Sequence, residues 1–299
     1  MNGAILSAAA AGMLGLVVLV SGCGTRPTQN ASGPSAKVSH AKPTAIIPTP
    51  AGTLDGTAPE PNGTMWVVAG SPASHGIYQI DLSQKKISGS VSVSNSATAI
   101  AESSTGLLAL GMATATTGAV QFLNGSSGAS LATVPLSGPV VALAAGDDGT
   151  TFYALNGNST SKAIAIINGQ KDTVESTIPA PSDAVSVVPA PNEQSVYVLE
   201  PNGVVSQIAT AGGHITTQFP IGHSGRALAI GPNGNTLYVL KGQGAVRNVA
   251  VVNLATESVK EVLPAPANAE NVVLSPDGQI LYDIVGAPRL GNVQAFSVP

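Results

Sequence analysis

The 299-residue chain has few charged residues, few aromatic residues and a single cysteine. Charged residues make up 9% and aromatic residues 3% of the chain, and the net charge is −4. A nucleic-acid-binding protein is expected to be basic, so this balance argues against such a partner. Aromatic rings are also too scarce to line a sugar-stacking groove. Because Cys23 is the only cysteine, an internal disulfide is excluded.

Motifs of common enzyme classes are missing as well. The four histidines are scattered, and neither HxxxH nor HExxH spacing occurs, so a zinc site is not expected. No GxSxG nucleophile elbow is present. The sequence therefore predicts no cofactor. It leaves open whether the protein is an enzyme, and favours the view that it is not.

The N-terminal segment has the features of an export signal. Residues 1–22 contain no Lys, Arg, Asp or Glu, and residues 4–20 form an apolar run of the length found in secretory signals. The run ends in VSGC at residues 20–23, which resembles the lipobox of bacterial lipoproteins, although MNGAIL carries no basic residue. The resemblance implies a signal peptide over 1–22, a lipid (palmitate) anchor on Cys23, and a location on the extracytoplasmic face of a bacterial membrane. The alternative is a membrane-spanning helix followed by an unrelated cysteine.

A polar segment follows the cysteine. Residues 24–43 are rich in Ser, Pro, Gly, Ala and Lys and show no apolar periodicity. This composition is typical of a flexible linker. We therefore divide the chain into a signal peptide (1–22), a lipidated Cys with a tether (23–43) and a folded domain (44–299).

The folded domain repeats itself. Turn-like segments end at Gly63, Gly106 and Gly149, 43 residues apart, and similar segments recur near residues 191, 232 and 276. An apolar strand follows each turn, and five of the six strands carry an aromatic residue, with Leu108 near that place in the second unit. A period of 40–45 residues with short alternating strands indicates a propeller or a solenoid. Each unit contains four such runs with hardly any helical pattern, which predicts four-stranded β-propeller blades.

The later units carry a more specific resemblance. The phrases LSPDGQILYDIV (274–285), IGPNGNTLYVLK (230–241) and VAVVNLATESVKEVLPAP (249–266) look like the YVTN-type repeats of exported bacterial β-propellers. The resemblance covers about residues 44–299 and implies an all-β propeller. Familiar members often have seven blades, whereas six turn segments are present here, so six blades are expected and seven remain possible.

The ends of the domain predict how the ring closes. AIIPTPAG (45–52) and EVLPAPAN (261–268) share one pattern, which in the fifth unit belongs to the outermost strand. The sixth unit supplies three strands, at 270–275, 280–285 and 292–298, but no fourth. We therefore expect residues 45–50 to be the outer strand of the last blade, which removes an open sheet edge.

Some polar residues recur in several units and are interpreted as structural. Asp81, Asn124, Asn168 and Asn253 each end a third strand, where their side chains can cap the following turn. The recurring aromatics are expected to pack between blades.

Function more often resides where a repeat is interrupted. In a propeller, the connections from fourth to first strand and from second to third strand share one face around the central channel. The candidate residues for a ligand or partner on this face are His223, Arg226, Lys241, Arg247, Glu270 and Arg289. Arginine forks suit carboxylate or phosphate groups. The alternative is a set of solvated loop charges paired with Glu270.

Acidic residues on the same face suggest a second function. Asp55, Asp183, Glu270 and Asn271 are weak candidates for a metal site of the kind used by lactonase propellers, although nothing in their spacing requires convergence. The favoured function is a membrane-anchored binding protein that presents one propeller face to a protein or a small anionic ligand. The alternative functions are a metal-dependent lactonase or hydrolase and an envelope scaffold without a ligand.

Overall fold

In the part of the chain that the structure describes, the regular elements are all β-strands, as the alternating sequence pattern predicts. The computed structural model describes residues 36–38, 42–71, 74–93, 96–287 and 290–298. The predicted signal peptide, Cys23, most of the predicted tether and Arg289 lie outside these described residues. No helix in the described segments is long and apolar enough to span a membrane.

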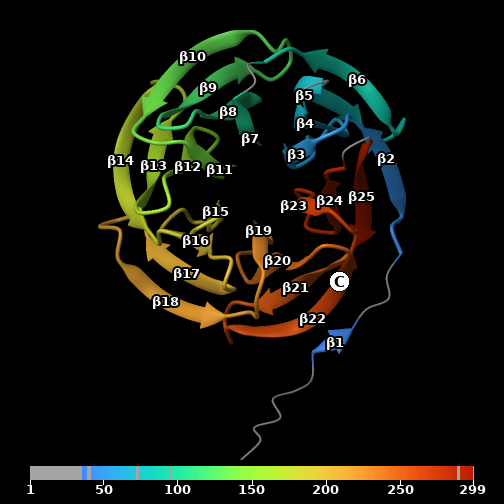
Figure 1. Ribbon diagram of the computed structural model, residues 1–299, viewed down its shortest axis with the longest axis vertical. Helices are drawn as coiled ribbons and strands as arrows, with labels where there is room; N and C mark the ends of the chain where they lie inside the picture. The colour runs from blue at the N-terminus through green and yellow to red at the C-terminus, as the bar shows by residue number, and fades with distance from the viewer. Residues whose placement is uncertain (1–35, 39–41, 72–73, 94–95, 288–289, 299) are drawn as a thin grey trace, which may run out of the picture. The chain divides into compact units, whose positions relative to one another are not determined.

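The strands form six antiparallel blades around a common centre (Figure 1). Blade 1 contains β3 (Thr53–Gly56), β4 (Thr64–Ser71), β5 (Ser74–Asp81) and β6 (Lys86–Val91), and blade 2 contains β7 (Ala97–Glu102), β8 (Leu107–Ala113), β9 (Gly118–Asn124) and β10 (Ser130–Leu136). Blade 3 contains β11 (Val140–Ala145), β12 (Thr151–Gly157), β13 (Lys162–Asn168) and β14 (Thr173–Ala180), and blade 4 contains β15 (Ser186–Pro189), β16 (Ser195–Leu199), β17 (Val204–Ala209) and β18 (Ile215–Pro220). Blade 5 contains β19 (Gly225–Ile230), β20 (Thr236–Gln243), β21 (Val246–Asn253) and β22 (Ser258–Ala265). Blade 6 contains β23 (Ala269–Leu274), β24 (Ile280–Val285), β25 (Gly291–Ser297) and, from the other end of the domain, β2 (Ala45–Thr49). The prediction of a six-bladed propeller is confirmed.

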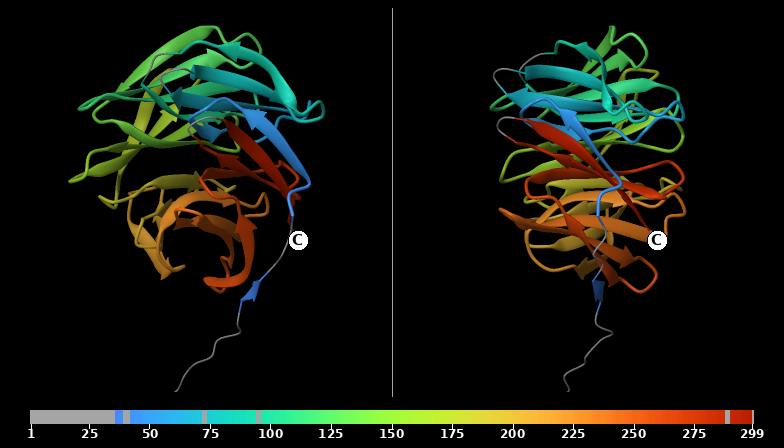
Figure 2. Two further views of the ribbon diagram at one scale, coloured as in Figure 1. Left: turned by 45° about the vertical axis from the view of Figure 1, so that its right-hand side comes forward. Right: turned by 90° about the vertical axis from the view of Figure 1, so that its right-hand side faces the viewer.

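The ring closes through its N-terminal strand, as predicted. β2 pairs antiparallel with β25, with Ala45 opposite Ala295 and Thr49 opposite Gly291. The two strands lie side by side in all three views (Figures 1 and 2). Ile47 is 1% exposed whereas Ile46 is 55% exposed, so the alternation of β2 directs one face into the core. Closure gives β25 the hydrogen-bonded neighbour that an edge strand lacks.

A further short strand, β1 (Lys37–Val38), pairs in parallel with β22 of blade 5. Lys37 lies opposite Glu261, and the chain then passes to blade 6 as β2. This strand lies within the segment predicted as a tether. The sequence contained no signal for it, because a two-residue pairing depends on backbone groups rather than on an apolar pattern.

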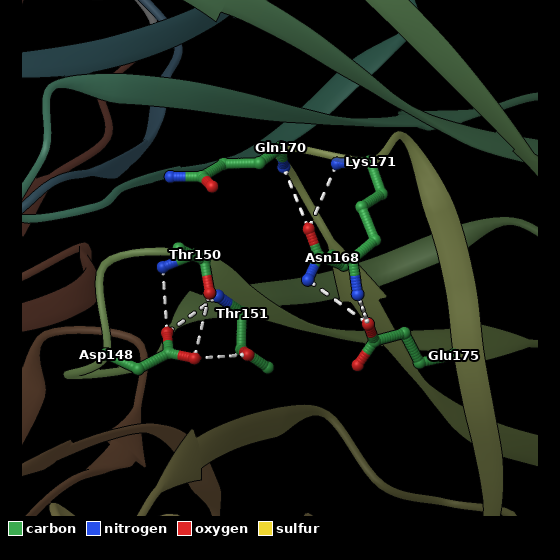
Figure 3. A network of polar contacts seen from close by, with 7 residues as sticks. All are labelled: Asp148, Thr150, Thr151, Asn168, Gln170, Lys171 and Glu175. Atoms are coloured by element: carbon green, nitrogen blue, oxygen red, sulfur yellow. Dashed lines mark hydrogen bonds and ion pairs between the residues drawn. The ribbon is translucent and has the colours of Figure 1, made fainter.

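Side chains of Asx type cap the turns, as predicted (Figure 3). The Oδ1 atom of Asn168 accepts hydrogen bonds from the backbone N–H groups of Gln170 (3.1 Å) and Lys171 (3.0 Å). Asp81, Asn124 and Asn253 accept equivalent backbone bonds in their own blades. A residue that satisfies the same turn in four blades has a structural role.

The recurring aromatics pack between blades, again as predicted. Trp66, Tyr153, Tyr197, Tyr238 and Tyr282 each belong to an apolar cluster shared with the next blade. Blade 2 differs from the prediction, because Leu108 faces back toward Trp66 and Ala109 occupies the corresponding place. The missing ring comes from Phe122, the cross-strand partner of Ala109, which contacts Phe152 of blade 3 edge-on with ring centroids 5.2 Å apart. In blade 2 an aromatic ring from β9, instead of one from β8, therefore fills the seam between blades 2 and 3.

Candidate binding face at the channel mouth

A cavity of about 720 Å³ lies at the centre of the ring and is lined by the first strands of the blades. Isoleucine, valine, leucine and alanine side chains such as Ile100, Val187 and Leu228 make up much of its wall. Polar side chains gather at its two ends. Of the residues predicted as a site, Asp55, Arg226, Glu270 and Asn271 line this cavity.

Bulges place one ring of side chains at this end. The strand register is interrupted near the start of the first strand in five blades, which leaves one residue without a cross-strand partner. A bulge re-aims the side chain of such a residue. The five residues are Leu54, Thr98, Val141, Arg226 and Glu270, and Val185 holds the same place in blade 4, where it precedes β15. All six line the cavity, and we call them the mouth ring.

The charges of the mouth ring belong to one ion pair between blades 5 and 6. Nη1 of Arg226 lies 3.1 Å from Oε2 of Glu270, and both side chains are about one-third exposed. Nε of Arg226 also donates a hydrogen bond of 3.2 Å to the carbonyl oxygen of Gly242. The remaining members are apolar, apart from Thr98. The mouth is therefore an apolar rim interrupted by a single partly exposed ion pair.

Arg247 lies beneath this pair and is buried. Its side chain is 4% exposed, and its Nη1 donates to the carbonyl oxygen of Ala269 and lies 3.4 Å from Oε1 of Glu270. Burial lowers the pKa of Arg247, although Glu270 opposes this shift. Blade 3 has the same arrangement, in which Nζ of Lys162 donates to the carbonyl oxygen of Ala184 at 2.5 Å. Because the contact recurs, Arg247 acts as a link between blades.

The other predicted basic residues are separated from this network. Nζ of Lys241 donates to the carbonyl oxygen of Ile221 at 2.6 Å, and burial lowers the pKa of the amine. His223 is exposed to solvent. Arg289 lies outside the described residues. The structure thus brings Arg226, Arg247 and Glu270 together, and their charges are largely satisfied by one another and by backbone carbonyls.

Two of the candidates for a metal site, Asp55 and Asn271, meet at the same end of the channel. The carboxylate of Asp55 accepts hydrogen bonds from the N–H groups of Gly56 (2.8 Å) and Ile100 (2.9 Å) and from the amide of Asn271. Asp55 is 7% exposed, and burial raises its pKa to about 6 against the effect of these hydrogen bonds. Asp183 is exposed and accepts from Ser182 (2.8 Å), away from the cavity. Within the described segments, no group of three or more His, Cys, Asp or Glu residues is arranged to hold a metal ion.

These contacts join neighbouring blades around the channel. Asp55 connects blade 1 to Ile100 of blade 2 and to Asn271 of blade 6. Thr98 Oγ1 donates to the carbonyl oxygen of Val140 at 3.0 Å, which connects blades 2 and 3. Ser186 Oγ accepts from the N–H of Leu228 at 3.1 Å, which connects blades 4 and 5. The polar residues near the mouth therefore hold the first strands together as well as facing the cavity.

Exposed apolar side chains on the same face were not anticipated from the sequence. Val246 is 75% exposed, Leu290 61% and Leu54 39%. Val246 begins β21 and Leu290 immediately precedes β25, so both lie at second-to-third-strand connections, and Leu54 is the second residue of β3 in blade 1. The Gly52 N–H donates to the carbonyl oxygen of Ala287 at 3.0 Å. This hydrogen bond joins the connection between β2 and β3 to the connection between β24 and β25. Val246 and Leu290 stand among turn residues in KGQGAVRN and VGAPRLGN. The sequence pattern predicts the charged residues of these two loops as site candidates and not the apolar ones.

Acidic side chains gather at the opposite end of the cavity. Glu60, Glu102 and Asp147 are among the lining residues there. Burial, together with the nearby carboxylate of Glu60, raises the pKa of Glu102 to about 8. The sequence provided no signal for this pair, because the two residues are 42 positions apart and meet only through blade packing.

Comparisons with known proteins found no family model that matches the chain and no curated protein that matches it. The class that the structure defines is therefore the six-bladed β-propeller. The finer resemblance to YVTN-type repeats stays a prediction.

Proposed function

We propose that this chain is an exported bacterial lipoprotein, of the kind that carries YVTN-type repeats, in which Cys23 is the anchor and the propeller is a binding module. Its binding face comprises the mouth ring with Val246 and Leu290, and its partner is a protein. Support for the anchor comes from the apolar run at 4–20 and the VSGC segment that ends at the cysteine. Two or more acyl chains would hold such a protein firmly at a membrane.

The exposed apolar residues carry the proposal for a protein partner. Val246, Leu290 and Leu54 lie on the face that carries the partly exposed Arg226–Glu270 pair. Protein interfaces combine apolar anchors with arginine at their centre and polar groups at the rim. A partly exposed ion pair on a face with exposed apolar side chains matches this composition.

A small anion is less well supported as the ligand. Arg247 is buried and already bonded to Ala269 and Glu270, and Lys241 is bonded to Ile221. An anion would have to displace Glu270 from Arg226, so the free positive charge at the mouth is small. A metal-dependent hydrolase needs open ligand positions. The described residues carry no observation that favours it, since the carboxylate of Asp55 is engaged by three donors.

Crosslinking in intact membranes, followed by mass spectrometry, tests the binding face. The test variant carries Val246→Asp and Leu290→Asp. The matched control carries Leu131→Asp and Ile215→Asp, which place the same charges on the outer strands β10 and β18 at residues that are 58% and 47% exposed. We expect one partner to be captured by wild type and the control but lost from the test variant. Equal capture by both variants would refute the face, and equal melting temperatures would show that both rings are intact.

The anchor has a separate test. Changing Cys23→Ser is expected to release the protein from membranes on fractionation, because no acyl chain can then be attached. If the variant remains in the membrane fraction, residues 4–20 are a spanning helix and the lipoprotein proposal is wrong.

A further inference from the structure

Asp283 occupies the centre of β24, a position at which the other five blades have apolar residues. The corresponding residues are Val67, Leu110, Ala154, Val198 and Val239. Asp283 is 0% exposed, and neither of its carboxylate oxygens has a hydrogen-bond partner in the described part of the chain. A buried carboxylate without a partner is strongly unfavourable. Asp283 therefore destabilises the core of blade 6 whenever its carboxyl group is ionised.

The carboxyl group points into the seam between blades 5 and 6. Asp283 lies directly opposite Val272 of β23, and opposed residues of an antiparallel pair share one face of the sheet. Val272 and Leu281 belong to one apolar cluster with Leu240 and Val249 of blade 5. The seam that contains Asp283 is therefore the one that carries the Arg226–Glu270 pair at the channel mouth.

The charged groups on the adjoining strands are a buried acid on β22, Glu261, which is 8% exposed, and groups that are engaged elsewhere. Arg247 on β21 is bonded to Ala269 and Glu270, and Lys241 on β20 is bonded to Ile221. Glu270 on β23 is engaged by two arginines, and Asp55 on β3 by three donors. Tyr238 on β20 belongs to the same apolar cluster, and burial raises its pKa further above the neutral range. β25 contributes no titratable residue. No cation is thus within ion-pair distance of Asp283 in the described chain.

We propose that Asp283 makes the seam between blades 5 and 6 a pH-sensitive joint, closed while the carboxyl is protonated and loosened when it ionises. A neutral carboxyl fits the apolar seam better than a carboxylate, which gains solvation only if the seam opens. Burial raises the pKa of Asp283 to about 8, consistent with this preference. Opening would separate Arg226 from Glu270, so it would also alter the mouth ring. The joint itself does not rest on the proposed function.

Hydrogen exchange measured by mass spectrometry at several pH values between 5.5 and 8 tests the joint in the full protein. If opening is coupled to ionisation, the opening equilibrium of seam peptides from β20, β21 and β24 should rise about tenfold per pH unit, after correction for intrinsic exchange. Peptides from the seam between blades 2 and 3, which contains Phe122 and Phe152, provide an internal control. Their corrected exchange should not follow this slope.

The matched variant is Asp283→Asn, which keeps the size and polarity of the side chain but cannot ionise. We expect the slope to vanish in this variant. A slope that is unchanged in Asp283→Asn, or one of equal size in the control seam, would overturn the proposal. Asp283→Val, which restores the residue of blades 1, 4 and 5, provides a second variant if Asp283→Asn does not fold. It too should lose the slope, and retention of the slope would refute the joint.

Discussion

The closure of the ring makes a sharp prediction at two neighbouring isoleucines. Ile47 is 1% exposed and belongs to an apolar cluster with Met65 and Val67 of blade 1, whereas Ile46 is 55% exposed on the same strand. Ile47→Ala should leave a cavity at the junction of blades 6 and 1. Truncation of a buried isoleucine to alanine destabilises proteins by about 2–5 kcal/mol. Ile46→Ala, a matched control, should change stability by less than about 0.5 kcal/mol, as exposed substitutions usually do.

Equilibrium unfolding in urea and thermal unfolding, both followed by circular dichroism, measure the difference between the two variants. For a domain of this size, a loss of 1 kcal/mol lowers the melting temperature by roughly 2–4 °C. Ile47→Ala should therefore melt roughly 4–20 °C below wild type, and Ile46→Ala close to it. Equal effects at the two positions would refute the register of β2 on β25. If neither change has an effect, β2 does not close the ring.

Two further changes test the seams. Asp55→Ala removes the acceptor for the N–H of Ile100 and the amide of Asn271, and each buried donor left unpaired is expected to cost about 1–3 kcal/mol in urea unfolding. Burial raises the folded-state pKa of Asp55 from 3.8 to about 6. Protonation of Asp55 therefore stabilises the folded protein below about pH 4, and this stabilisation is lost as the pH rises through about 6. Asp55→Asn should remove this part of the pH dependence of stability, and an unchanged pH profile would contradict the assignment. Phe122→Ala should destabilise the fold by about 3–5 kcal/mol because it empties the seam to Phe152, whereas Leu131→Ala, 58% exposed, should be near neutral in the same assay. A small effect at Phe122 would show that the seam does not depend on this ring.

The candidate site was only partly accessible to sequence reasoning. Arg226, Arg247 and Glu270 were placed on one face and do meet, because the repeat assigns each to a known connection. Pairing with Glu270 was stated as the alternative to a free basic face, and the choice between the two depends on side-chain direction across a seam, which the repeat does not encode. The exposed Val246 and Leu290 were overlooked because an isolated apolar residue in a loop has no periodicity. Asp283 was visible within ILYDIV, but its lack of a partner emerges only when blade 5 packs against it.

The amino-acid sequence by itself determined the architecture. The period of 40–45 residues and the four alternating runs per unit predicted a propeller with six blades expected, and the shared outer-strand pattern predicted closure by the N-terminal strand. The structure settled the count at six and placed the closing strand at residues 45–49. The sequence also predicted the Asx caps of the turns, but tertiary structure alone decided the roles of the residues that lie between blades and at the channel mouth. Asp55 joins three blades, Arg247 is buried as a link, and Phe122 replaces the aromatic that β8 lacks. These roles depend on contacts between residues far apart in the chain, and such contacts exist only once the blades have packed.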